Sequence, residues 1–147
     1  MNRRNASLAL SLLVFLPFSA GTKASSAHPA VPAKVAQDDQ LLVGNWKSSQ
    51  FGTQTLNTRP DGTATLTMRL STMAAVLYGR ELTLELKWTL EGQTLTQHVV
   101  GGTPEKGVQK LTRKFGDTYT YHVVEATPAE LVVEDVSTGK TSHWSAL

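Results

Sequence analysis

Residues 81–90 read Glu-Leu-Thr-Leu-Glu-Leu-Lys-Trp-Thr-Leu, so that every second side chain is large and apolar. Successive side chains of a β-strand point to opposite faces, and this spacing therefore puts all the apolar side chains on one face. An α-helix would spread the same leucines around its circumference. The segment is predicted to be a strand that turns its leucines and Trp88 toward a core.

The same alternation continues on both sides of this segment, and turn sequences rich in Gly, Pro and Asp interrupt it. The clearest turn is Arg-Pro-Asp-Gly at residues 59–62, where Pro presets one backbone dihedral and Gly tolerates a positive φ. We expect strands over residues 44–50, 53–58, 63–70, 81–90, 94–100, 118–124, 130–136 and 141–147, with a further short strand possible within 73–78. The sequence therefore predicts one antiparallel all-β domain.

One segment departs from the strand period. Thr103, Pro104 and Glu105 form a typical helix start, with Thr as the N-cap, Pro in the first helical position and an early acid. Apolar and basic residues then occupy opposite sides of a helix: Val108, Leu111 and Phe115 against Lys106, Lys110, Arg113 and Lys114. One short amphipathic helix is predicted, although Gly107 is unfavourable inside a helix. Its basic side could meet an anionic membrane or an acidic partner, but packing over an open end of the domain explains the pattern more simply.

The N-terminus has the pattern of a cleavable signal peptide. Arg3 and Arg4 precede an apolar run over residues 8–18, and small residues suited to signal peptidase follow. The run is well short of the roughly 20 residues that a membrane-spanning helix needs. Cleavage could follow Gly21, Ala24 or Ala27. We expect residues 1–24 to be the signal peptide, 25–39 a flexible tether rich in Ala, Ser and Pro, and 40–147 the folded domain.

Cleavage changes the charge of the chain. The full sequence has 14 Lys and Arg against 12 Asp and Glu, and a cut after Ala24 removes Arg3, Arg4 and Lys23, leaving 11 against 12. This balance gives no support to nucleic-acid binding, which needs a clustered positive surface. The chain has no cysteine, which excludes disulfides, thiolate metal sites and a thiol nucleophile. A periplasmic or secreted protein without an integral membrane segment is expected.

The first predicted strand opens with Gly44-Asn45-Trp46, which resembles the Gly-x-Trp signature of lipocalins. The similarity extends to the succession of short antiparallel strands, the Pro60-Asp61-Gly62 hairpin and the closing strand with Trp144. From about residue 41 to 147, the chain resembles a small bacterial lipocalin-like domain of the calycin group. The resemblance implies a single up-and-down barrel of about eight strands around an apolar cavity, with Gly44 and Trp46 as a structural signature and the tryptophan closing one end.

This resemblance leads to the hypothesis of a domain that binds a small apolar ligand. An eight-stranded barrel is just wide enough for its own side chains or for one small ligand. Aromatic rings offer broad apolar area, and a phenol can add one orienting hydrogen bond. The candidate ligand-binding residues are Trp88, Tyr119, Tyr121, Leu86 and Met68. In the alternative hypothesis, bulky side chains fill the barrel, and the domain is a protein-interaction or inhibitor module for an unknown protein partner.

Catalysis and metal binding have less support from the sequence. His98, His122 and His143 share strand faces with Thr and Ser, and their spacing is not that of a metal motif. Asp135 falls on the same predicted strand face as Leu131 and Val133, but it adjoins a turn, where a strand can end in water. There is no Gly-x-Ser-x-Gly elbow or phosphate-binding glycine loop. We expect no enzyme, no cofactor and no metal site, while catalytic groups assembled from distant strands stay an open alternative.

Overall fold

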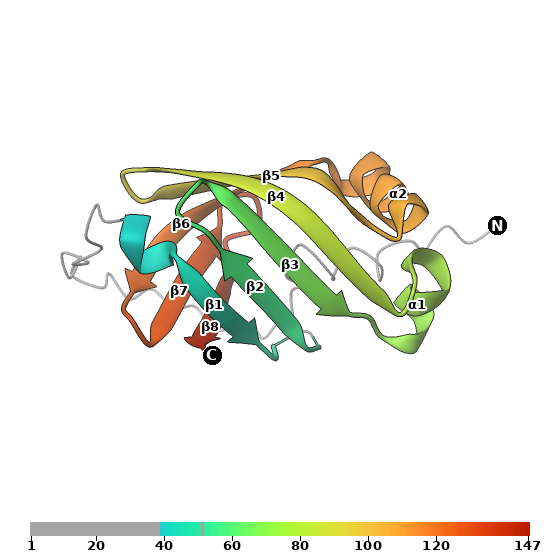
Figure 1. The fold of residues 1–147 in the computed structure, drawn as a ribbon, viewed down its shortest axis with the longest axis horizontal. Coiled ribbons are helices and arrows are strands. Elements are labelled where there is room, and N and C mark those ends of the chain that lie inside the picture. The colour runs from blue at the N-terminus through green and yellow to red at the C-terminus, as the bar shows by residue number, and fades with distance from the viewer. Residues whose placement is uncertain (1–38, 51) are drawn as a thin grey trace.

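Eight antiparallel strands run in chain order around a closed barrel, each paired with the next and β8 paired with β1 (Figure 1). The structure is a computed structural model that describes residues 39–50 and 52–147; the predicted signal peptide and the tether up to residue 38 lie outside the described residues. The strands are β1 (Gly44–Ser48), β2 (Gln54–Thr58), β3 (Thr63–Arg69), β4 (Glu81–Glu91), β5 (Thr94–Thr103), β6 (Thr118–Ala126), β7 (Glu130–Asp135) and β8 (Thr141–Ala146). The predicted all-β, up-and-down barrel of about eight strands is confirmed.

The apolar side chains that alternate along the sequence line the inside of the barrel. In β4, the inward side chains from Leu82 to Trp88 are buried, and the residues between them are more exposed. Strand pairing sets such side chains next to each other, as it does Leu66 of β3 and Leu84 of β4. The buried apolar residues of all eight strands form one continuous core.

The two ends of the barrel differ. One end carries a 3-10 helix, η2 (Asp39–Leu42), and the connections from β2 to β3, β4 to β5 and β6 to β7. The opposite end carries α1 (Thr72–Tyr78), between β3 and β4, and α2 (Glu105–Phe115), between β5 and β6 (Figure 1). We call them the closed end and the helical end. At the helical end, α1 and α2 contact each other, and both contact β4.

Helix α2 confirms the predicted amphipathic helix. Val108 and Leu111 are buried on one side, where the helix packs on β5, while the basic side chains are exposed. The helix begins one position later than predicted, because Pro104 rather than Thr103 is the N-cap, with an extended backbone at φ −69° and ψ 139°. Gly116 ends the helix at a φ of 87°, a value that glycine adopts without strain.

Helix α1 corrects two expectations. The possible strand within 73–78 was wrong, and the described residues contain two α-helices rather than one. Ala74 and Tyr78, four residues apart, are both buried, so the segment packs inward with the period of a helix. Met, Ala and Leu favour helix, which agrees with this conformation.

A close approach of two backbones shapes the long hairpin of β4 and β5. At Gly102 the φ is 148°, and a Cβ there would stand 2.0 Å from the carbonyl oxygen of Thr83. No side chain fits at that distance. The pairing also shifts register between Glu85 and Leu86, which marks a β-bulge. Glycine therefore lets β5 follow β4 as far as the start of α2.

Candidate ligand-binding site

Trp46 lies at the closed end, as the Gly-x-Trp resemblance implies. Its side chain is 2% exposed, and its indole N–H donates a hydrogen bond of 3.0 Å to the carbonyl oxygen of Leu42 in η2. The Thr58 hydroxyl donates to the same carbonyl oxygen and accepts a hydrogen bond from the Gly44 amide. These contacts fasten η2 to β1 and β2, so that Trp46 and Gly44 serve the closure of the barrel.

Trp88, the first ligand candidate, is also held by the backbone. Its indole N–H donates to the carbonyl oxygen of Thr63 at 3.1 Å, and its amide donates to Gly62 at 2.8 Å. The ring is buried next to Gln97 of β5, its partner in the strand register. The polar atom of Trp88 is therefore engaged, which leaves only its ring face for a ligand.

Tyr119 and Tyr121 stand on the inward face of β6, in the half of the barrel nearer the helical end. The Tyr119 hydroxyl donates to the carbonyl oxygen of Gly116 at 2.8 Å. Burial, with the nearby Asp117 carboxylate, raises the pKa of Tyr119 to about 12. Burial, the Asp135 carboxylate and Tyr119 raise the pKa of Tyr121 further. Both phenols are therefore neutral at physiological pH and can act as hydrogen-bonding groups.

Asp135 is buried, contrary to the expectation that it ends in water. It is 3% exposed, and its Oδ1 accepts hydrogen bonds from the amides of Ser137 and Thr138 and from the Ser137 hydroxyl, at 2.5–2.9 Å. The carboxylate thus satisfies the backbone of the turn between β7 and β8, as an Asx turn does. Because these donors come from the turn itself, the strand can end with its acid inside the protein.

The interior carries further polar side chains that the sequence reasoning did not single out. Ser142 of β8 is fully buried, and its Oγ has no hydrogen-bond partner. Three larger groups are almost as deeply buried and form no side-chain hydrogen bond with another residue in the described part of the chain: Gln54 of β2, Gln97 of β5 and Tyr121 of β6. Buried polar groups in proteins are nearly always paired, so the Ser142 hydroxyl is unusual.

These polar groups do not surround the interior evenly. Together with buried Ser48 of β1, they occupy β5, β6, β8, β1 and β2, which we call the polar arc: Ser48, Gln54, Gln97, Tyr121 and Ser142. Of the remaining strands, β3 and β4 form an apolar wall that includes the candidates Met68 and Leu86, and β7 contributes apolar side chains together with Asp135. The five predicted ligand residues thus all line the interior, with Met68 and Leu86 facing from one wall and the tyrosines from another. A polar residue with the parity of apolar neighbours, such as Gln97 between Leu95 and Val99, is the sequence signal that could have found the arc.

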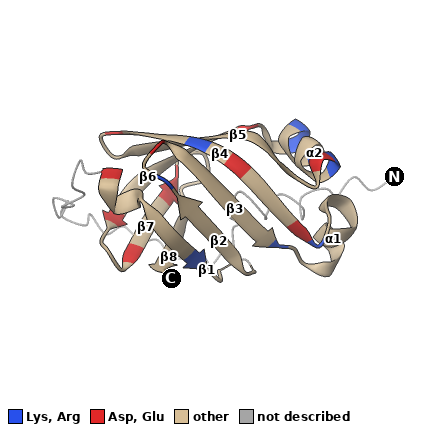
Figure 2. Cartoon of the chain, viewed as in Figure 1, with Lys and Arg blue, Asp and Glu red and all other residues tan. Residues whose placement is uncertain are grey.

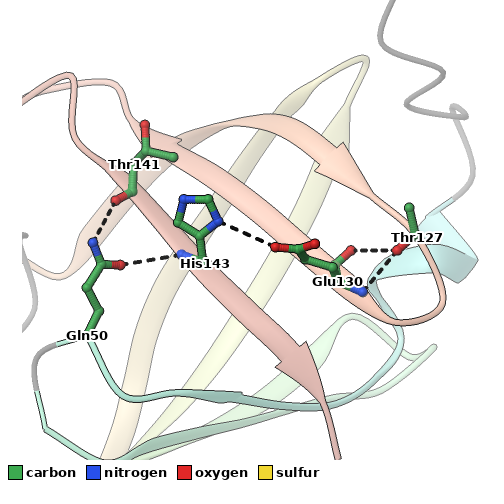
Figure 3. Close-up of polar contacts among 5 residues, drawn as sticks. All are labelled: Gln50, Thr127, Glu130, Thr141 and His143. Carbon is green, nitrogen blue, oxygen red and sulfur yellow. Dashed lines mark hydrogen bonds and ion pairs between the residues drawn. The ribbon is translucent and has the colours of Figure 1, made fainter.

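The histidines lie outside the barrel. His98, His122 and His143 are exposed, and His143 stands 3.5 Å from the Glu130 carboxylate on the neighbouring strand. Figure 3 shows this pair beside Gln50, whose side chain bonds to the backbone of β8. Within the described residues, no group of three or more His, Asp or Glu side chains could hold a metal ion.

A surface groove of about 590 Å³ runs between α2 and the end of β5. Apolar side chains such as Val100 and Val108 line it together with Glu105, Arg113 and Asp117. The groove is open to solvent on the outside of the barrel. It is the feature of the structure that a protein-interaction module would use.

Comparisons with known proteins bear on the fold. No family model and no curated protein matches this chain. Among solved structures, it is similar to a lipocalin-like protein from Bacteroides uniformis ATCC 8492, with a TM-score of 0.54 and 16% sequence identity, over 73% of this chain and 99% of that one. An uncharacterized protein from Bacteroides eggerthii DSM 20697 matches with a TM-score of 0.48 and 9% identity, over 71% and 98%. The first likeness confirms the lipocalin-like fold that the Gly-x-Trp resemblance predicts.

Proposed function

We propose that this lipocalin-like barrel is an exported binding protein for a small, mainly apolar ligand that carries one neutral polar group. The observation that carries the proposal is the polar arc, above all the fully buried Ser142 Oγ without a partner. Leaving a buried polar group unpaired costs about 1–3 kcal/mol. This unpaired hydroxyl, together with the amide and phenol groups of the polar arc, favours a guest that supplies hydrogen bonds over a barrel filled with its own side chains.

The distribution of the lining groups defines the ligand further. The apolar wall on β3 and β4, with Leu66, Met68 and Leu86, offers contact to a hydrocarbon body. Gln97 and Tyr121 face it from β5 and β6, and both are neutral at physiological pH, where a phenol with a pKa of about 10 or higher is protonated. A hydroxyl, carbonyl or amide on the ligand suits these partners better than a charged group, whose desolvation they could not offset.

Binding rather than catalysis fits the groups inside the barrel. The acid among them, Asp135, accepts three hydrogen bonds from its own turn. Tyr119 is occupied by the Gly116 carbonyl oxygen, and burial raises its pKa to about 12. A general base needs a pKa near the working pH and a free lone pair directed at the substrate. We therefore propose no enzymatic activity.

The proposed export rests on the N-terminal sequence. The basic pair Arg3 and Arg4, the apolar run over 8–18 and the small residues after it support delivery to the periplasm or beyond the cell. In the described residues, no helix is both long and apolar enough to span a membrane. A fold stabilised without cysteines is compatible with an oxidising compartment.

Competition for a bound fluorescent probe tests the function. N-phenylnaphthylamine, a neutral apolar fluorophore, should bind with one-to-one stoichiometry and increase in emission. Dodecanol should displace it at lower concentration than dodecane, because only the alcohol can pair with the arc. Tyr121→Phe and Gln97→Met should each reduce that preference by several-fold, while the matched control Thr89→Ala, on the outer face of β4, should leave it unchanged. A protein that binds neither the probe nor the alcohol would contradict the proposal.

The groove beside α2 favours the interaction module as a second candidate. It predicts that a protein partner binds with an affinity that depends on Val100 and Arg113, which line the groove. Val100→Asp would then abolish partner binding and leave probe binding intact. Variants of Gln97 and Tyr121 would weaken probe binding and leave partner binding intact.

A further inference from the structure

Helix α1 presents an apolar face to solvent. Met73, Val76 and Leu77 are 77%, 82% and 48% exposed, and their i, i+3, i+4 spacing places them on one side of the helix. Ala74 and Tyr78, on the opposite side, account for its packing against the domain. Because the domain buries its other side, the exposed apolar face is not needed for the fold. Contiguous exposed apolar groups of this kind mark interaction sites.

Basic side chains border this face. Lys110 of α2 reaches across to α1, where its Nζ lies 3.4 Å from the carbonyl oxygen of Leu77. Lys106 and Lys114 stand one turn before and after Lys110, on the same row of α2. On the other side, Arg80 lines a shallow surface groove together with Val76. The apolar tips are therefore framed by cations from both sides.

The charge of the whole domain is divided between its ends. Residues 39–147 contain ten Lys and Arg against eleven Asp and Glu, yet residues 69–81 and 104–116 together hold six basic against two acidic side chains. Figure 2 shows several blue segments on α2, with others on β1 and β4, and red segments on η2, β7 and β4. A near-neutral domain thus has a positive helical end and a negative remainder. In front of an anionic surface, this asymmetry turns the helical end toward the surface.

We propose that the helical end docks on an anionic lipid surface, with Met73, Val76 and Leu77 entering the headgroup region and Arg80, Lys106, Lys110 and Lys114 pairing with lipid phosphates. The exposed tips of Met73, Val76 and Leu77 lie on one side of α1, so they can enter the headgroup region together. The flanking lysines have long apolar stems that allow their ammonium groups to stay at phosphate level. Apolar insertion combined with basic flanks is the arrangement by which helices bind in the membrane interface. This inference is independent of the proposed ligand.

The chain has no cysteine, so one introduced thiol gives a site-specific reporter. In the full chain, an environment-sensitive fluorophore on Val76→Cys should shift to shorter wavelength with vesicles that contain phosphatidylglycerol, and should not respond to vesicles of phosphatidylcholine alone. The matched control is Ala129→Cys, which is exposed in the connection from β6 to β7 at the closed end and should stay in water. The predicted signal peptide is present in both labelled proteins, so its own affinity for lipid is the same in the two measurements.

The charge component is tested in the same labelled protein. Lys106→Gln and Lys110→Gln should each weaken vesicle binding about fivefold, the usual effect of one cation at an anionic membrane. Raised salt should weaken it as well. Met73→Ser should reduce the wavelength shift, and its 77% exposure predicts an unchanged unfolding curve. The proposal would be overturned if the fluorophore did not shift on bound vesicles, or if it shifted equally with neutral vesicles. It would also be overturned if the lysine variants bound vesicles as well as the unchanged protein. Polyglutamate is an anionic polymer without lipid, and a response to it alone would likewise contradict the proposal.

Discussion

Gly107 of α2 lies against the backbone carbonyl of Tyr78 in α1, so closely that a Cβ at position 107 would stand 2.4 Å from the carbonyl oxygen. That distance is far inside van der Waals contact, and the nearby Leu82 side chain limits any movement away from it. Judged by helix propensity alone, Gly107 is the weak point of α2. The structure shows instead that it is the position that allows the two helices to meet.

Gly107→Ala should therefore destabilise the protein. Alanine is better than glycine in a helix by about 1 kcal/mol, but relief of the clash has to separate α1 from α2, and overpacking of this kind costs about 1–3 kcal/mol or more. Urea unfolding should show a lower midpoint for Gly107→Ala than for wild type. Gln109→Ala, exposed on the same helix, should be nearly neutral. A Gly107→Ala protein more stable than wild type would show that the helices do not pack in this way.

The sequence was a sufficient guide to the barrel because the core imposes period two on nearly all the strands, β7 with its three consecutive buried residues being the exception. It also located α2, whose buried and basic sides differ strongly in polarity. It failed at α1 for a physical reason: Met73, Val76 and Leu77 are apolar but exposed, so the outer face of that helix resembles its inner face. Seven residues without a polar side are too few for periodicity to separate a helix from a strand.

The interior was predicted in part. All five candidate ligand residues line the barrel, because parity along a strand decides which side chains point inward. Parity does not reveal hydrogen-bond partners, so the sequence could not show that the indole of Trp88 is engaged or that the Ser142 hydroxyl is unpaired. Asp135 was misjudged since its partners are backbone amides of the next turn, which composition does not disclose.

Asp135 should hold the turn between β7 and β8 through both its hydrogen-bond acceptor and its charge. Asp135→Ala removes the acceptor of three hydrogen bonds and leaves two turn amides without it, which should lower the free energy of unfolding by about 2–4 kcal/mol. Asp135→Asn keeps an oxygen acceptor but loses the charge, so its loss should be about half as large. Chemical denaturation of both variants measures the difference. Equal losses would mean that the charge accounts for the whole effect, and an Asp135→Asn protein as stable as wild type would mean that charge contributes nothing to the turn.

The indole hydrogen bond of Trp46 should be measurable against a second tryptophan. Trp46→Phe removes ring volume and the hydrogen bond to Leu42, whereas Trp144→Phe removes similar volume from a buried ring with no indole hydrogen bond among the described residues. Both variants lose apolar contact, but Trp46→Phe should lose about 1 kcal/mol more. Thermal and urea unfolding of the pair provide the comparison. A larger loss for Trp144→Phe would argue against the fastening of η2 through Trp46.

All three tyrosines of the chain should titrate abnormally late. Burial raises the pKa of Tyr78, and burial with neighbouring carboxylates raises the pKa of Tyr119 to about 12 and that of Tyr121 further. The unfolded chain releases its phenol protons near pH 10, so above that pH it binds fewer protons than the folded state. The stability that comes from the raised pKa values is therefore complete below pH 10 and is lost as the pH rises through about 12.

Ultraviolet absorbance of tyrosinate, followed together with circular dichroism, tests this sign. At pH 10.5 the folded protein should show almost no tyrosinate from Tyr119 and Tyr121, whereas the same chain in urea is more than half ionised by the usual phenol pKa of about 10. Ionisation should then coincide with unfolding, since each phenolate has to leave the core to be solvated. Tyr119→Phe should remove one third of the final absorbance change and should advance the ionisation of Tyr121 slightly, because Tyr119 is one of the groups that raise the pKa of Tyr121. A phenol that ionises near pH 10 while the circular dichroism stays native would place that tyrosine in contact with water and out of the barrel wall.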